Sequence, residues 1–179
     1  MPGSPPYIAV AGPGEGAGAR DRELARQVGR ELARAGAVLL CGGLGGVMAA
    51  ACEGAASGGG TAVGLLPGSD RSAGNPYLSV ALATGLGELR NGLLVRAADA
   101  VITIGGSWGT LSEIALAIRT GRPVIALGGW QLAAGPASGT PGAARSPRGG
   151  PVPAGSAAEA VRLALAAAGG AEPAAGSGG

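Results

Sequence analysis

Residues 102 to 113, ITIGGSWGTLSE, combine an apolar run, two glycines, hydroxyl side chains and one carboxylate in a short stretch. The stretch can be a strand that turns into a capped helix, because Thr110 and Glu113 have the S/T-x-x-E spacing of a capping box. It can also be a phosphate-binding turn, because a helix start offers free N–H groups to an anion. Glu113 would then be a candidate catalytic carboxylate beside the phosphate. Residue types alone leave both interpretations open, and Glu113 can serve in both.

Glycines follow three apolar runs, at residues 12–18, 42–46 and 105–109. Each group precedes a predicted helix, whose free N–H groups and dipole attract anions. Because the carboxyl ends of parallel strands meet at one rim, we expect the three turns to face a shared site. Glycine also serves geometry alone at tight turns, and that alternative stays open for each turn. The first turn lacks the G-x-G-x-x-G register and Cys41, not an acid, ends the second strand, so a mononucleotide-sized anion fits better than a dinucleotide.

The residue types that are missing exclude several chemistries. The chain of 179 residues contains no His, and all 13 of its basic residues are Arg, so it has no Lys. An imidazole base, a His-ligated metal, a Walker A lysine and a pyridoxal phosphate Schiff base are therefore excluded. Cys41 and Cys52 lie in apolar segments, where we expect reduced packing residues rather than a metal site or a disulfide. We expect neither a metal nor a resident cofactor.

The charge balance and the apolar runs limit the partners. A net charge of +2, two Tyr, two Trp and no Phe give little reason to expect nucleic-acid binding. The first residues lack a signal-peptide pattern, and no apolar run reaches the roughly 18 residues of a membrane span. We expect a cytoplasmic protein with a small-molecule ligand and no membrane partner.

Short apolar runs alternate with helical patterns along the chain. The runs predict strands at 7–11, 37–41, 61–66, 78–82, 100–104 and 123–127, and the patterns between them predict helices at 21–35, 47–56, 86–98 and 110–120. This alternation is typical of parallel βαβ units, and the unbroken Val, Ile and Leu runs fit strands covered on both faces. Right-handed crossovers then predict an α/β fold, a three-layer α/β/α Rossmann-like sandwich with a mainly parallel sheet.

The composition changes after Trp130 and again near the end. Residues 132–155 are rich in Pro, Gly, Ala and Ser and are expected to form a flexible insertion. A last helix is predicted at 156–168, with Ser156 as N-cap and Glu159 completing a capping box. Residues 1–168 would then be a single Rossmann-like nucleotide-binding domain, and 169–179 a disordered tail.

Four segments together resemble the LOG-like family, whose members are often labelled lysine decarboxylase-like. These segments read CGGLGGVMAAACEGA at 41–55, LPGSDRSAGNPY at 66–77, TGLGELRNGLLVRAADAVITIGGSWGTLSEIALAI at 84–118 and GRPVIALGGW at 121–130. The family includes cytokinin riboside monophosphate phosphoribohydrolases and the molybdenum-cofactor carrier protein. The closest form is its small bacterial branch with LPG-x-DRS-x-x-NPY, whose role is poorly defined. The missing Lys contradicts the decarboxylase label.

The resemblance assigns roles to residues of this chain. In the enzymes the motif is PGGxGTxxE, with an upstream M-x-x-R-K that supplies a catalytic arginine. Glu113 and Arg90 match the acid and the arginine, whereas Ser107 replaces a glycine and Asn91 the lysine. The candidate catalytic residues are therefore Glu113 and Arg90. The candidate phosphate- or nucleotide-binding residues are Gly12, Gly42, Gly43, Gly46, Met48, Gly106, Ser107, Gly109 and Thr110.

Two functions follow from the resemblance. The first is a nucleoside 5′-monophosphate phosphoribohydrolase, an N-glycosidase that releases a base and ribose 5-phosphate. Glu113 would stabilise the oxocarbenium-like state and orient water, and Arg90 would hold the phosphate or ribose. The alternative is a non-catalytic carrier or sensor of a phosphorylated pterin, such as the molybdenum cofactor, or of a nucleotide. Family members usually form dimers, which implies a homodimer.

Three residues keep open alternatives. Trp108 can stack on a base or pack on a neighbouring subunit. Asp70 and Arg71, in the polar loop 67–76, can close over a ligand or form a surface ion pair. Each alternative depends on where the fold places the side chain.

Overall fold

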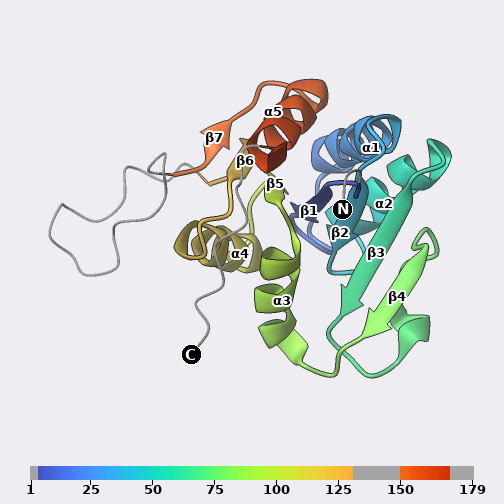
Figure 1. Ribbon diagram of the computed structural model, residues 1–179. Helices are drawn as coiled ribbons and strands as arrows, with labels where there is room; N and C mark the ends of the chain where they lie inside the picture. The colour runs from blue at the N-terminus through green and yellow to red at the C-terminus, as the bar shows by residue number, and fades with distance from the viewer. Residues whose placement is uncertain (1–3, 131–149, 170–179) are drawn as a thin grey trace, which may run out of the picture.

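The computed structural model describes residues 4–130 and 150–169 (Figure 1). In these residues the strands are β1 (Tyr7–Ala11), β2 (Val38–Cys41), β3 (Thr61–Leu66), β4 (Val80–Ala83), β5 (Ala100–Ile104), β6 (Val124–Leu127) and β7 (Val152–Pro153). The helices are α1 (Ala19–Arg34), α2 (Val47–Ser57), α3 (Arg90–Ala97), α4 (Trp108–Arg119) and α5 (Ala157–Gly169). Two short 3₁₀ turns, η1 (Arg71–Ala73) and η2 (Gly87–Leu89), precede β4 and α3.

The strands form one all-parallel sheet in the order β4-β3-β2-β1-β5-β6-β7. Along β1, Ile8 and Val10 point to a core shared with α1, α2 and α5, whereas Ala9 points to a second core shared with α3 and α4. Figure 1 shows the two groups of helices on opposite faces of the sheet. The predicted three-layer α/β/α Rossmann-like sandwich is confirmed, and its sheet is entirely parallel in the described residues.

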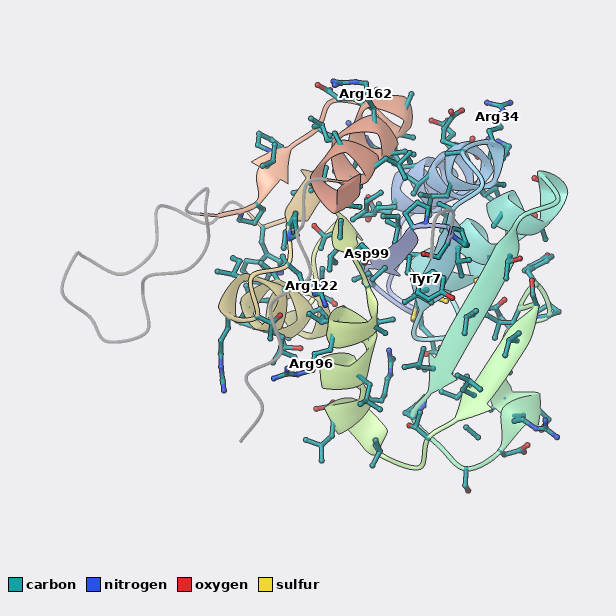
Figure 2. All side chains as sticks on the ribbon, viewed as in Figure 1. Tyr7, Arg34, Arg96, Asp99, Arg122 and Arg162 are labelled. Carbon is teal, nitrogen blue, oxygen red and sulfur yellow. The ribbon has the colours of Figure 1, made fainter. Side chains whose placement is uncertain are left out.

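The strand order reverses between β1 and β5. The chain proceeds from β1 outward to β4 on one side and from β5 outward to β7 on the other, so β1 and β5 are neighbours at a topological switch point. At the opposite ends of these two strands, the Tyr7 amide donates to the Asp99 carboxylate at 2.8 Å (Figure 2). In open α/β sheets, ligands bind beside the carboxyl ends of the strands at such a point. The glycine-rich turns after β1 and β5 therefore flank the expected ligand position.

Several sequence predictions differ from the structure. Strand β7 lies inside the segment 132–155 that was expected to be a flexible insertion, and the Ala154 amide donates to the Ala126 carbonyl at 2.9 Å. Two residues, one of them proline, carry no periodicity that could reveal a strand. Residues 132–149 of that segment and 170–179 of the predicted tail lie outside the described residues. Element bounds differ as well: α4 begins at Trp108 rather than at Thr110, α3 begins at Arg90 rather than at 86, and β4 begins at Val80 rather than at 78.

The two cysteines pack where β2 meets α2. Cys41 and Cys52 are free and buried, with their Sγ atoms 3.4 Å apart. The hydrogen bond with Cys52 and burial raise the pKa of the Cys41 thiol well above its usual value. Both belong to the core beneath α1 and α2, as the sequence predicts.

Candidate functional site

Ser107, not Thr110, caps the N-terminus of α4. Its backbone is extended (φ −139°, ψ 170°), and its Oγ accepts a hydrogen bond from the Thr110 amide at 3.2 Å. The Thr110 hydroxyl lies 2.9 Å from the same oxygen. The predicted capping box of Thr110 and Glu113 is therefore wrong, because an earlier hydroxyl takes the N-cap position and moves the helix start forward. Glu113 lies beyond the first turn and is free of any capping role.

The N-cap leaves the first amides of α4 available. The helix's own hydrogen bonds do not use the N–H groups of its first turn, and Ser107 takes that of Thr110. The amides of Trp108 and Gly109 thus begin the helix without an intrahelical acceptor. Together with the helix dipole they favour an anion at this end of α4.

Arg90 is held at the junction of η2 and α3. The Gly87 amide donates to the Pro67 carbonyl at 2.9 Å, which ties η2 to the loop after β3. The Arg90 guanidinium lies over Gly42, at the end of β2, where a Cβ would overlap it. Arg90 is only 8% exposed, and its Nε and Nη1 are buried with no hydrogen-bond partner in the described residues. A buried cation with unused donors is costly without a partner, so it marks a place for an anionic ligand.

Glu113 lies on the first part of α4 and is also 8% exposed. Burial raises the pKa of its carboxyl from an ordinary 4.5 to about 7, and the positive charge of Arg90 opposes that rise. Within residues 4–130 and 150–169, no ion pair includes either residue. The site therefore combines an unpaired cation with an acid that is half protonated near neutral pH.

A cavity of about 490 Å³ joins these groups. Its volume lies within the range of small-molecule sites. Seven predicted site residues line it: Gly12, Met48, Arg90, Ser107, Gly109, Thr110 and Glu113. The structure thus brings both candidate catalytic residues and the turn that begins α4 to one cavity at the switch point. Met48 also belongs to the core, so the packing role and the contact position coincide.

Four predicted binding glycines do not line the cavity. Gly42 supports Arg90, and Gly43 lies against the Leu66 side chain. Gly46, with φ +67°, approaches the Gly14 carbonyl too closely for any side chain. Gly106 lies against the Trp130 ring. These positions show why glycine is needed for packing, and direct ligand contact by these four residues stays a prediction.

The other lining residues were not among the candidate binding or catalytic residues, although Trp108 was considered for stacking on a base and Asn91 stands in the arginine motif. They are Ala11, Gly14, Leu44, Pro67, Gly87, Glu88, Asn91, Trp108 and Ser112. Glu88 and Asn91 lie within one helical turn of Arg90, and that spacing was the available signal. Pro67 carried none, because its place depends on the hydrogen bond between its carbonyl and the Gly87 amide.

Trp108 lies at the cavity and is 79% exposed. Its ring centroid is 5.3 Å from that of Trp130, with 47° between the ring planes. The Trp130 indole Nε1 donates to the Ser107 carbonyl at 3.0 Å. Trp130 therefore packs beside Trp108 and is hydrogen-bonded to the N-cap residue of α4.

The loop after β3 contributes Pro67 but neither of its charged residues to the cavity wall. Asp70 accepts hydrogen bonds from the Ser72 amide at 2.8 Å and the Ser72 hydroxyl at 2.6 Å, which caps η1. No ion pair joins Asp70 to Arg71 within the described ranges.

In the residues that the structure describes, no helix is both long and apolar enough to cross a membrane.

Known proteins share this fold and parts of this sequence. The model of the SLOG cluster4 family matches residues 5–144. The molybdenum cofactor binding protein of Rippkaea orientalis is 33% identical, with 91% of this chain and 97% of that chain covered and a TM-score of 0.78. The molybdenum cofactor carrier protein of Chlamydomonas reinhardtii is 28% identical, with coverage of 91% and 98% and a TM-score of 0.74. An uncharacterised protein of Archaeoglobus fulgidus is 44% identical over 115 residues, which are 63% of this chain and 76% of that protein.

Proposed function

This chain belongs to the SLOG cluster4 family, and from that premise we propose that its cavity binds a phosphorylated pterin of the molybdenum-cofactor class as a carrier. Two solved relatives are described as binding or carrying that cofactor. The cavity volume of about 490 Å³ is suitable for a ligand of that size. The resemblance found in the sequence is confirmed at the level of the family.

The observation that carries the proposal is Arg90. Its guanidinium is buried at the cavity, and Nε and Nη1 lack partners in the described residues. A phosphate would accept these donors in charge-assisted hydrogen bonds, which guanidinium forms in a bidentate way. The amides that begin α4 line the same cavity and would serve the same anion.

Removal of the guanidinium tests the proposal. Arg90→Gln should lose most of the ligand, whereas Arg96→Gln, a change at an exposed arginine of α3 outside the cavity (Figure 2), should retain it. The proteins are purified in parallel, denatured, and the released small molecules identified by mass spectrometry. A phosphorylated pterin from wild type and Arg96→Gln, but not from Arg90→Gln, is the expected result. Equal retention by both variants would contradict the proposal.

A second function is favoured by a separate observation, the pKa of Glu113. A buried acid with a pKa of about 7 at the cavity can exchange a proton at neutral pH, as a hydrolase of nucleoside 5′-monophosphates requires. In that reaction the Glu113 carboxylate orients water on the sugar C1′, and the N-glycosidic bond breaks to leave a base and ribose 5-phosphate. Arg90 would hold the 5′-phosphate.

The two functions differ in turnover. Incubation with AMP, GMP, CMP and a cytokinin monophosphate, followed by assay of ribose 5-phosphate, decides between them. Release by wild type above a Glu113→Gln control supports the hydrolase. Without such release, the hydrolase is discarded and the carrier stands.

The assembly and the location are further parts of the proposal. We propose a cytoplasmic homodimer, its dimer following the resemblance of the sequence to its family. The net charge of +2 and the few aromatic residues support the proposal that it binds no nucleic acid. Sedimentation equilibrium and a filter-binding assay with single-stranded DNA test the dimer and the absence of nucleic-acid binding. A monomer at micromolar concentration would contradict the dimer.

A further inference from the structure

Trp108 is the largest side chain left in solvent at the cavity. It is 79% exposed although an indole is mostly apolar, and it lines the same hollow as Arg90 and Glu113. An exposed indole at a cavity offers a flat apolar face on which another ring can stack. The cavity therefore has a polar, buried part and an aromatic, open part.

The ring of Trp108 is supported from behind. Trp130 packs against it at a tilt of 47°, and the Trp130 Nε1 is bonded to the Ser107 carbonyl. The Trp130 ring itself rests on Gly106, where a Cβ would lie 3.2 Å from it. A tilted contact covers little of the Trp108 ring, in agreement with its high exposure. Trp130 is thus fixed to the N-cap residue of α4, and Trp108 packs against it while most of its own ring stays exposed.

Trp108 is also the first residue of α4, next to the N-cap Ser107. Its amide lies where a phosphate would accept it, and its side chain extends from the same residue. Trp108 and the start of α4 line the same cavity, so a ligand that places its phosphate at the helix start can place an attached ring beside the indole. A planar heteroaromatic ring has two flat apolar faces that match this surface.

We propose that Trp108 is a specificity residue that stacks on the planar heteroaromatic ring of the phosphorylated ligand. This inference rests on the proposed binding of a phosphorylated ligand in the cavity and adds which part of that ligand Trp108 recognises. Arg90 and the α4 amides bind the phosphate, and Trp108 separates ligands that carry a ring from those that do not.

Two probes that share a phosphorylated ribose separate the contribution of the ring to binding from that of the phosphate. GMP carries a fused aminopyrimidinone ring, as pterins do, and ribose 5-phosphate carries none. Their affinities are measured by isothermal titration calorimetry for wild type, Trp108→Ala, Trp108→Phe and Leu89→Ala, with chromatography to show that GMP stays intact. Leu89 is 80% exposed and does not line the cavity, so its variant is the matched control for loss of an exposed apolar side chain.

GMP should bind wild type more tightly than ribose 5-phosphate does. Trp108→Ala should weaken GMP binding by about 5- to 100-fold, as loss of base–aromatic stacking does, and leave ribose 5-phosphate unchanged. Trp108→Phe should retain most of the GMP affinity, and Leu89→Ala all of it. Equal affinities of the two probes for wild type, or equal losses for both in Trp108→Ala, would overturn the inference while the proposed function stands.

Two other results also count against it. If Trp108→Ala changes the sedimentation coefficient and not the GMP affinity, Trp108 is a subunit contact and the inference fails. If wild type binds neither probe, the inference fails, and the proposed function is decided separately by the ligand that co-purifies with wild type and Arg90→Gln.

Discussion

The guanidinium of Arg90 lies directly over the Cα of Gly42, which brings the start of α3 onto the end of β2. A methyl group at position 42 would overlap Nη1, Nη2 and Cζ of Arg90. The φ angle of Gly42 is not positive, so the backbone at this position does not require glycine. The guanidinium is the flexible end of a long side chain, so it would move rather than the backbone. Glycine at this position therefore sets where the cation lies.

Gly42→Ala should weaken binding of a phosphorylated ligand by about tenfold, because it displaces a charge-assisted hydrogen-bond donor. The same substitution should have little effect in an Arg90→Gln background, because its effect passes through Arg90. A double-mutant cycle by calorimetry with GMP measures this coupling. Additive losses would show that Gly42 acts independently of Arg90.

Ligand affinity should depend on the charge of Glu113. Its carboxyl, with a pKa of about 7, is mostly neutral at pH 6 and mostly ionised at pH 8, where it repels a phosphate. Glu113→Gln removes that repulsion, so the ratio of the wild-type Kd to the Glu113→Gln Kd should rise as pH increases through 7. The ligand's own ionisation is common to both proteins and cancels in this ratio. A ratio that is constant from pH 6 to 8 would contradict an ionisable Glu113 near the phosphate.

The free energy of unfolding should depend on the ionisation of Glu113. The folded-state pKa of Glu113 is raised, so its contribution to the free energy of unfolding is fully present below pH 4.5 and is lost as pH rises through about 7. The loss amounts to about 3 kcal/mol at alkaline pH. The free energy of unfolding of Glu113→Gln minus that of wild type should therefore increase by about this amount between pH 4.5 and 8.5. Urea titrations at several pH values measure it, and a pH-independent difference would be the contrary result.

The cap of α4 should tolerate glycine better than alanine. Ser107→Ala removes the acceptor of the Thr110 amide and should lower the free energy of unfolding by about 1 kcal/mol. Ser107→Gly should lower the free energy of unfolding by only about 0.3 kcal/mol, since glycine is an acceptable N-cap. Ser112→Ala, at an exposed position inside the helix, is the control and should change stability by less than about 0.5 kcal/mol. If Ser112→Ala costs as much as Ser107→Ala, the N-cap assignment is wrong.

The sequence predicts most of the fold because the signals are local. Unbroken runs such as AVITI at 100–104 and the spacing of Leu24, Val28 and Leu32 reflect burial on fixed faces of a strand and a helix. Strand β7 carries no such signal, because two residues cannot show a period. The N-cap of α4 is ambiguous in the sequence because two hydroxyl residues, Ser107 and Thr110, compete for the position.

Only the tertiary structure decides the chemistry of the site. The sequence alone determines that an acid and an arginine stand in family positions and that no His or Lys is present. Burial raises the pKa of Glu113, and burial also leaves Nε and Nη1 of Arg90 without a hydrogen-bond partner in the described residues. Desolvation depends on how many atoms surround a group in space, whereas sequence patterns record only which face of its own element it occupies. The sequence therefore determines which residues form the site, and the packing of the fold determines their ionisation and pairing.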